Sequence, residues 1–264
     1  MTPAEVSELI RGISTDHIVA FFVVLARITP LFVIAPVFSS QLLIPRVRSV
    51  LAVGMAIGLT PLASHGETMP TGFLAVAALM AQSALVGFAL AFACACMFAA
   101  VQGAGVLADA LSGFSYGQSV DPINGNPGGA MTNLYSMIGI ALFLAIGGDA
   151  WVLRGLDATF HAVPLNQGPN VSSLLAGAES MLASVTLGAV EIVAPLMLAI
   201  IIADVAFGMV SKVVPQLNVF AVGFPLKVGI ALLMVSVSLP FIAGWMSSQL
   251  ETSVTVALHT LRVG

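Results

Sequence analysis

The chain has 264 residues, of which 59% are apolar and only 8% are charged, and its formal net charge is −4. Soluble domains carry about 25% charged residues, so eight basic and twelve acidic side chains are too few to cover a water-soluble globule. This composition argues against a soluble enzyme and a secreted disulfide scaffold. The acidic balance also argues against nucleic-acid binding, which needs a basic surface.

Six apolar segments follow one another along the chain, and a membrane-spanning helix needs about 20 such residues. They are Ile18–Phe38, Val50–Ala63, Thr68–Ala108, Met131–Leu153, Leu174–Val210 and Val213–Met246. The third is longer than one span, so it is either one long helix or a broken pair, and Gly147 and Gly148 interrupt the fourth. We expect one all-α integral membrane domain over residues 1–264, packed as helical hairpins that Pro and Gly bend or break.

The sequence lacks most motifs that carry chemistry, with no P-loop, H-E-x-x-H or C-x-x-C pattern. Gly113-Phe-Ser-Tyr-Gly117 fits G-x-S-x-G, but an apolar helical run and no strand precedes it. We predict no catalytic residue, no cofactor and no metal site. Gly103-x-Gly105-x-x-Ala108 matches a dinucleotide-binding pattern, but it follows an apolar helical run, so close helix packing is the better interpretation. Cys94 and Cys96 are interpreted as small apolar packing residues.

Charged side chains inside the apolar segments are costly where they face lipid, so each should face protein or water. They are Arg27, Asp109, Asp149, Glu191, Asp204 and Lys227. Glu191 and Asp204 are 13 residues apart, which places them about 220° apart around a helix, so they form no obvious dyad. Pairs between helices or subunits are favoured over a proton relay. A secondary transporter that uses these two carboxylates remains an alternative, although no internal repeat is visible. A scaffold with no passage of its own is another.

Between the third and fourth segments lies the only extended Gly-rich polar stretch, Gly113–Gly129, which we predict to be a loop. This stretch also contributes to a family resemblance. Three blocks of the sequence resemble the FliR/SctT family of type III export-gate subunits. They are Arg27–Phe38 followed by Ile44–Arg48, Gly105–Gly117 leading into Asp121-Pro122, and Pro215–Lys227. The third block is the most specific, and the resemblance covers nearly the whole chain.

The resemblance implies a subunit of the flagellar protein export gate, a multi-pass protein of the bacterial inner membrane and the flagellar basal body. With FliP-like and FliQ-like subunits it would form the channel for unfolded flagellar proteins, next to FlhB-like and FlhA-like components. The injectisome export gate is the alternative within the same family. Membrane lipid is an expected partner and nucleic acid is not.

The resemblance also implies two groups of site residues. The family's plug loop in the gate lumen maps onto Phe114, Ser115, Tyr116, Gly117, Gln118, Asp121 and Pro122. Packing or inter-subunit contacts are expected at Arg27, Pro45, Arg48, Asp109, Asp149, Glu191, Asp204, Pro215, Gln216, Asn218, Phe220 and Lys227. In the last block, the Gln and Asn side chains are expected to bind the carbonyl groups that Pro215 leaves free.

Overall fold

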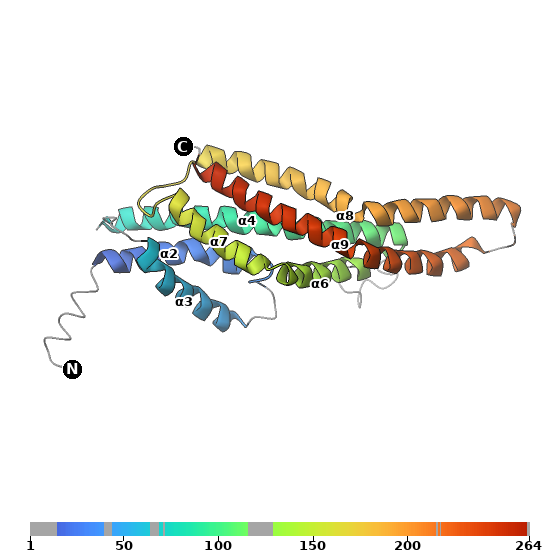
Figure 1. Cartoon of the computed structure of the whole chain (residues 1–264), viewed down its shortest axis with the longest axis horizontal. Coiled ribbons are helices and arrows are strands. Elements are labelled where there is room, and N and C mark those ends of the chain that lie inside the picture. Colours follow the sequence, from blue (N-terminus) through green and yellow to red (C-terminus); the bar gives the residue numbers. More distant parts are fainter. Residues whose placement is uncertain are drawn as a thin grey trace. The chain divides into compact units, whose positions relative to one another are not determined.

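The computed structural model describes residues 15–39, 44–63, 69–70, 72–115, 129–214, 216 and 218–262, and these contain seven α-helices and no strand (Figure 1). The helices are α2 (Thr15–Ile34), α3 (Pro45–Ala63), α4 (Phe73–Ser112), α6 (Ala130–Ala145), α7 (Gly148–Ala162), α8 (Val171–Val213) and α9 (Val219–Arg262). Five of them are long and apolar enough to cross a membrane, and α6 with α7 forms a bent pair that makes a sixth candidate. The predicted all-α class with about six apolar segments is confirmed.

The break in the fourth apolar segment is at the predicted glycine pair. The chain bends by 68° between α6 and α7. Gly147 has a φ of +70°, the left-handed conformation that ends many helices, and its N–H donates to the carbonyl of Leu144 at 3.1 Å. By contrast, the third segment is one helix of 40 residues and not a broken pair. Prolines also break fewer helices than expected, because Pro195 lies inside the continuous helix α8 and Pro240 inside the continuous helix α9.

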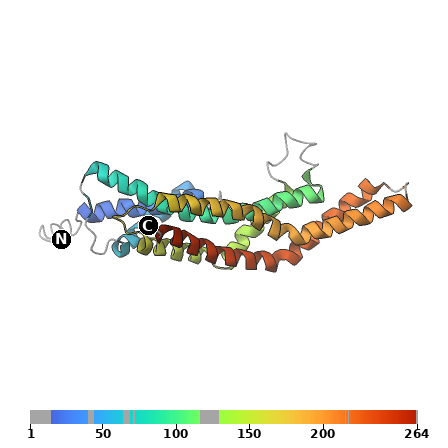
Figure 2. The ribbon, with the colours of Figure 1, turned by 90° about the horizontal axis from the view of Figure 1, so that it is seen from above.

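The chain divides into two compact units. Unit 1 comprises residues 1–95, 150–180 and 251–264, and unit 2 comprises residues 96–149 and 181–250. In unit 1, α2 and α3 form a helical hairpin. In unit 2, α8 and α9 run side by side as an antiparallel pair (Figures 1 and 2). The boundary between the units falls within helices α4, α8 and α9, and the single domain over residues 1–264 stays a prediction.

Small residues let the helices of unit 2 approach one another closely. A Cβ atom added to Gly103 would lie 3.1 Å from the Cβ of Ala189, and one added to Gly105 would lie 2.7 Å from the Cα of Thr132. Ala108 is fully buried. The packing interpretation of the Gly103–Ala108 pattern is therefore confirmed. The two cysteines are also buried and free, as an apolar packing role requires.

Candidate functional site

A fully buried arginine joins three helices of unit 1. Arg27 of α2 donates from Nε to Ser83 Oγ of α4 at 3.0 Å. Its Nη1 donates to the carbonyls of Thr159 and Val163, at 3.1 and 2.9 Å. These two carbonyls belong to the C-terminal end of α7, which carries partial negative charge, and that of Thr159 also accepts the main-chain N–H of Val163 at 3.0 Å. The guanidinium also lies over the Phe160 ring, 4.7 Å from its centroid. Arg27 thus connects α2, α4 and the end of α7.

The backbones of α2 and α4 touch beside this arginine. A Cβ atom added to Gly87 of α4 would overlap the main-chain carbonyl of Arg27. Ser83 and Gly87 are one turn apart and therefore share a face of α4, forming a pair of small residues that lets two helix backbones approach. The glycine allows the close approach and the serine accepts the hydrogen bond from the arginine.

In unit 2, a buried aspartate caps the N-terminus of another helix. Asp109 of α4 accepts the main-chain N–H of Met131 at Oδ1 and that of Thr132 at Oδ2, both at 2.9 Å. Oδ2 also accepts the Thr132 hydroxyl at 2.6 Å. A helix leaves its first N–H groups without intrahelical partners, and its N-terminus favours negative charge. We call this set of contacts the Asp109 clasp.

The clasp replaces an ordinary N-cap. The residue before α6 is Gly129, which makes no side-chain cap, although its φ of −60° is one that any residue adopts. A Cβ atom there would overlap the Asp109 carboxylate. Glycine is therefore required at this position for a steric reason and not for its backbone freedom.

Glu191 and Asp204 have separate partners on α9, both in unit 2. Trp245 donates from Nε1 to Glu191 Oε2 at 3.0 Å, and its ring lies where a Cβ atom of Gly188 would project. Asp204 forms an ion pair with Lys227. The two carboxylates do not bind each other, as the angular separation along the helix predicts, and each serves as a contact between α8 and α9. These contacts do not favour the transporter alternative.

The third block of the family resemblance includes the start of α9. Asn218 Oδ1 accepts the main-chain N–H of Ala221 at 3.1 Å, which is an N-cap contact. The side-chain oxygen therefore binds an N–H group, whereas the sequence predicted a contact to carbonyls. Gln216 is exposed. Pro215 and the side chain of Phe220 lie outside the described residues.

Only the first two residues of the candidate plug lie within the described part of the chain. Phe114 makes an edge-to-face contact with Phe224, with ring centroids 6.2 Å apart, and Ser115 is exposed. The other predicted plug residues lie outside the described residues: Tyr116, Gly117, Gln118, Asp121 and Pro122. The start of the Gly-rich stretch thus packs on the Gly223-Phe224-Pro225 part of the third block.

The remaining predicted contact residues lie at helix ends. Pro45 and Arg48, in the first turn of α3, line a groove between α2 and α3. Asp149 is exposed in the first turn of α7, where a negative charge suits the helix dipole.

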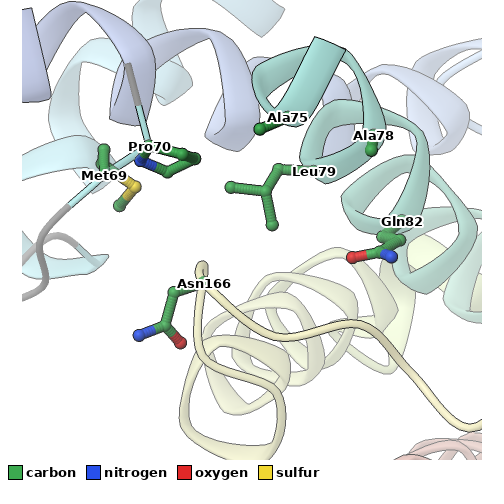
Figure 3. Close-up of a pocket in the computed structure, with 7 residues that line it drawn as sticks. All are labelled: Met69, Pro70, Ala75, Ala78, Leu79, Gln82 and Asn166. Carbon is green, nitrogen blue, oxygen red and sulfur yellow. The ribbon is translucent and has the colours of Figure 1, made fainter. Parts of the chain in front are cut away.

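A second hollow in unit 1 lies at the beginning of α4, with a volume of about 500 Å³ (Figure 3). Leu79 and Gln82 line it from α4, and Asn166 lines it from the segment between α7 and α8. None of its lining residues is titratable, so the hollow offers no acid, base or nucleophile. The described residues also contain no group of three or more His, Cys, Asp or Glu side chains able to hold a metal ion.

Sequence reasoning missed the partners of Arg27, Asp109 and Glu191. Ser83, Thr159 and Thr132 carry no signal that separates them from other small polar residues of membrane helices. Trp245 was the one partner with a visible signal, because a buried indole N–H in an apolar helix usually finds an acceptor.

Comparison with known proteins shows what kind of chain this is. The family described as "Bacterial export proteins, family 1" matches residues 18–253. The flagellar biosynthetic protein FliR of Escherichia coli K12 is 27% identical over 223 residues, which cover 84% of this chain and 85% of that protein. FliR of Bacillus subtilis 168 is 29% identical over 234 residues, 86% and 88% of the two chains. The surface presentation of antigens protein SpaR of Salmonella typhimurium LT2 is 28% identical over 210 residues, 79% and 78% of the two chains. Since the family match extends over most of the sequence, the chain belongs to family 1 of the bacterial export proteins.

Proposed function

We propose that the chain is a FliR-type subunit of the flagellar protein export gate. The observation that carries this proposal is the family match over residues 18–253, together with flagellar relatives that align over more than four-fifths of the chain. Its five helices that are apolar and long enough to cross a membrane fit a multi-pass protein of the flagellar export apparatus. We place it in the bacterial inner membrane and assign it no enzymatic activity.

In this proposal the chain forms the export channel with FliP-like and FliQ-like subunits, next to FlhB-like and FlhA-like components. The apolar surface supports an assembled state: only 17% of the residues in the most apolar part of α3, and 22% in that of α9, are buried within the chain. Exposed apolar surface of this extent is covered either by lipid or by other subunits.

Native mass spectrometry of the detergent-extracted chain, co-expressed with its genomic neighbours, tests this assembly. A single particle that contains FliP-like and FliQ-like subunits supports the gate. A stable monomer or homodimer that ignores these subunits contradicts it. Deletion of the gene should also abolish motility and flagellar subunit export.

We further propose that residues 114–122 form the plug of the channel. The Asp109 clasp supports this, because it holds the start of α6 against α4 and so fixes the far end of the segment that contains the plug. Deleting Phe114–Pro122 should make the membrane leaky to small ions, while the assembled complex keeps its mass. Unchanged conductance in a correctly assembled complex contradicts the plug.

A second candidate is the injectisome export gate, and the similarity to SpaR favours it. Complementation separates the two candidates. A flagellar subunit should restore motility to a strain that lacks its own FliR, whereas an injectisome subunit should restore effector secretion to a strain that lacks SpaR.

A further inference from the structure

The groove between α2 and α3 has an apolar wall on each side and a basic residue at one end. Its volume is about 380 Å³. Leu25 and Phe32 line it from α2, and Val53 lines it from α3. Arg48 is the only charged residue among those that line it, and it lies in the first turn of α3.

The hydroxyl groups in the groove leave its walls effectively apolar. Thr29 Oγ1 donates to the carbonyl of Leu25 at 2.7 Å, and Ser49 Oγ donates to the carbonyl of Pro45 at 3.1 Å. Both hydroxyl hydrogens are thus used within their own helix, so the groove suits a hydrocarbon occupant over a polar one along most of its length.

Arg48 supplies the charge at the end of the groove. Residues 17–66 include three arginines and no aspartate or glutamate. Arg27 is buried among α4 and α7. Arg46 and Arg48 both lie in the first turn of α3 but are about 200° apart around the helix, and only Arg48 lines the groove. An occupant with a negative group at this end and an apolar body therefore complements both parts of the groove.

The outer surface of α3 is apolar. Val50 is 70% exposed and Ile57 is 60% exposed, and both lie on a helix that is long and apolar enough to span a membrane. Arginines at the end of such a helix reach toward the lipid headgroups, where the phosphates lie. Basic pockets between membrane helices bind anionic lipid headgroups for this reason.

We propose that the α2–α3 groove binds an anionic phospholipid. Its phosphate contacts Arg48, and part of one acyl chain lies along Leu25, Phe32 and Val53. The site is complete within this chain, so it does not depend on the proposed role in flagellar export. Acyl-chain burial supplies affinity, and Arg48 supplies the preference for a negative headgroup.

The test uses the full-length chain in the complex that it forms with its co-expressed subunits, stripped of lipid in a neutral detergent. Phosphatidylglycerol or phosphatidylcholine with the same acyl chains is added, and native mass spectrometry counts the bound lipids. We expect a preference for phosphatidylglycerol of about fivefold, since one basic residue acts on the headgroup. R48Q should lower that preference toward one, whereas R46Q on the other side of α3 and K212Q at the exposed end of α8 should leave it unchanged.

A second variant tests the acyl-chain part of the groove. V53W fills the groove and should reduce binding of both lipids, whereas I57W, one turn further along α3 and outside the groove, should not. An unchanged headgroup preference in R48Q overturns the proposal, as does equal lipid binding by V53W and I57W. A cysteine placed at Val53 could instead cross-link to a partner subunit while phosphatidylglycerol and phosphatidylcholine bind equally. That result would show that a protein helix fills the groove, and it would overturn the proposal. Loss of the partner subunits from the same spectrum would contradict the proposed function and not the lipid site.

Discussion

Removing the Asp109 carboxylate should loosen the N-terminus of α6. In Asp109→Ala, the main-chain N–H groups of Met131 and Thr132 lose their acceptor, and the contact to Met131 is buried. Leaving a buried donor unsatisfied costs about 1–3 kcal/mol. With one buried amide and one partly buried amide, we expect the free energy of unfolding to fall by about 3 kcal/mol. Asp109→Asn keeps one acceptor oxygen, so its loss should be about half as large.

The change in unfolding free energy is measured by titrating the purified chain in mixed micelles with a denaturing detergent. Hydrogen exchange gives the local readout, because the peptide that contains Met131 and Thr132 should exchange faster in the Asp109 variants. The matched control is Asp157→Asn on the exposed face of α7, which removes the same charge and should change stability by no more than about 0.5 kcal/mol. If Asp109→Ala behaves like this control in both measurements, the clasp contributes nothing to the helix end.

Gly129 supplies a double-mutant test of the same clasp. Gly129→Ala should be destabilising because the new methyl group overlaps the Asp109 carboxylate, although the backbone conformation suits alanine. In the Asp109→Ala background that overlap is absent, so the cost of Gly129→Ala should largely disappear. Additive effects of the two substitutions would show that the carboxylate and residue 129 do not interact.

Three further substitutions test the other polar contacts, with unfolding of the purified chain as the measurement. Arg27→Lys should lower the free energy of unfolding by about 2–3 kcal/mol, because an ammonium group cannot reproduce the three hydrogen bonds and the ring contact; a neutral result would contradict the role of the guanidinium. Trp245→Phe should cost about 1 kcal/mol through the lost hydrogen bond, whereas Glu191→Gln, which keeps an acceptor oxygen, should cost less; equal costs would argue against that bond. Exchanging the charges of Asp204 and Lys227 together should restore most of the stability that either single reversal removes, and a double variant no better than the singles would exclude a direct pair.

The helices themselves could be predicted from the sequence because burial in lipid demands long apolar runs. The bend at Gly147 was also predictable, since two consecutive glycines interrupt such a run and one of them adopts a left-handed conformation. The helix ends were less predictable. Helix α9 continues to Arg262, well past the predicted end at Met246, because the polar residues that follow the apolar run form a helix equally well. Apolar content marks where a helix contacts lipid or protein, not where its hydrogen bonding ends.

The sequence indicates which charged residues make contacts inside the protein, but it does not indicate which groups they bind. The rule that charges in apolar helices face protein correctly singled out Arg27 and Asp109, which are both buried. The rule does not say what neutralises them, and pairing with an opposite charge was the natural expectation. For Asp109 two of the three partners are main-chain N–H groups, which the sequence cannot show because every residue except proline has one. Only the tertiary arrangement brings a particular helix end to a particular side chain.

The signs of these charges match the helix ends that they contact. Arg27, a cation, binds carbonyls at the C-terminal end of α7, and Asp109, an anion, binds N–H groups at the N-terminal end of α6. Where water is absent, a helix end has no other source of hydrogen bonds, so a long helix that passes the end of a short one must supply them. Helices α6 and α7 are the two short members of the bent pair, and these two ends are the ones farthest from their shared break. A charge of the wrong sign at either position would repel the helix dipole and remove these hydrogen bonds. We therefore expect charge reversal at position 27 or 109 to be more damaging than reversal at Glu191 or Asp204, which bind side chains and remain exposed.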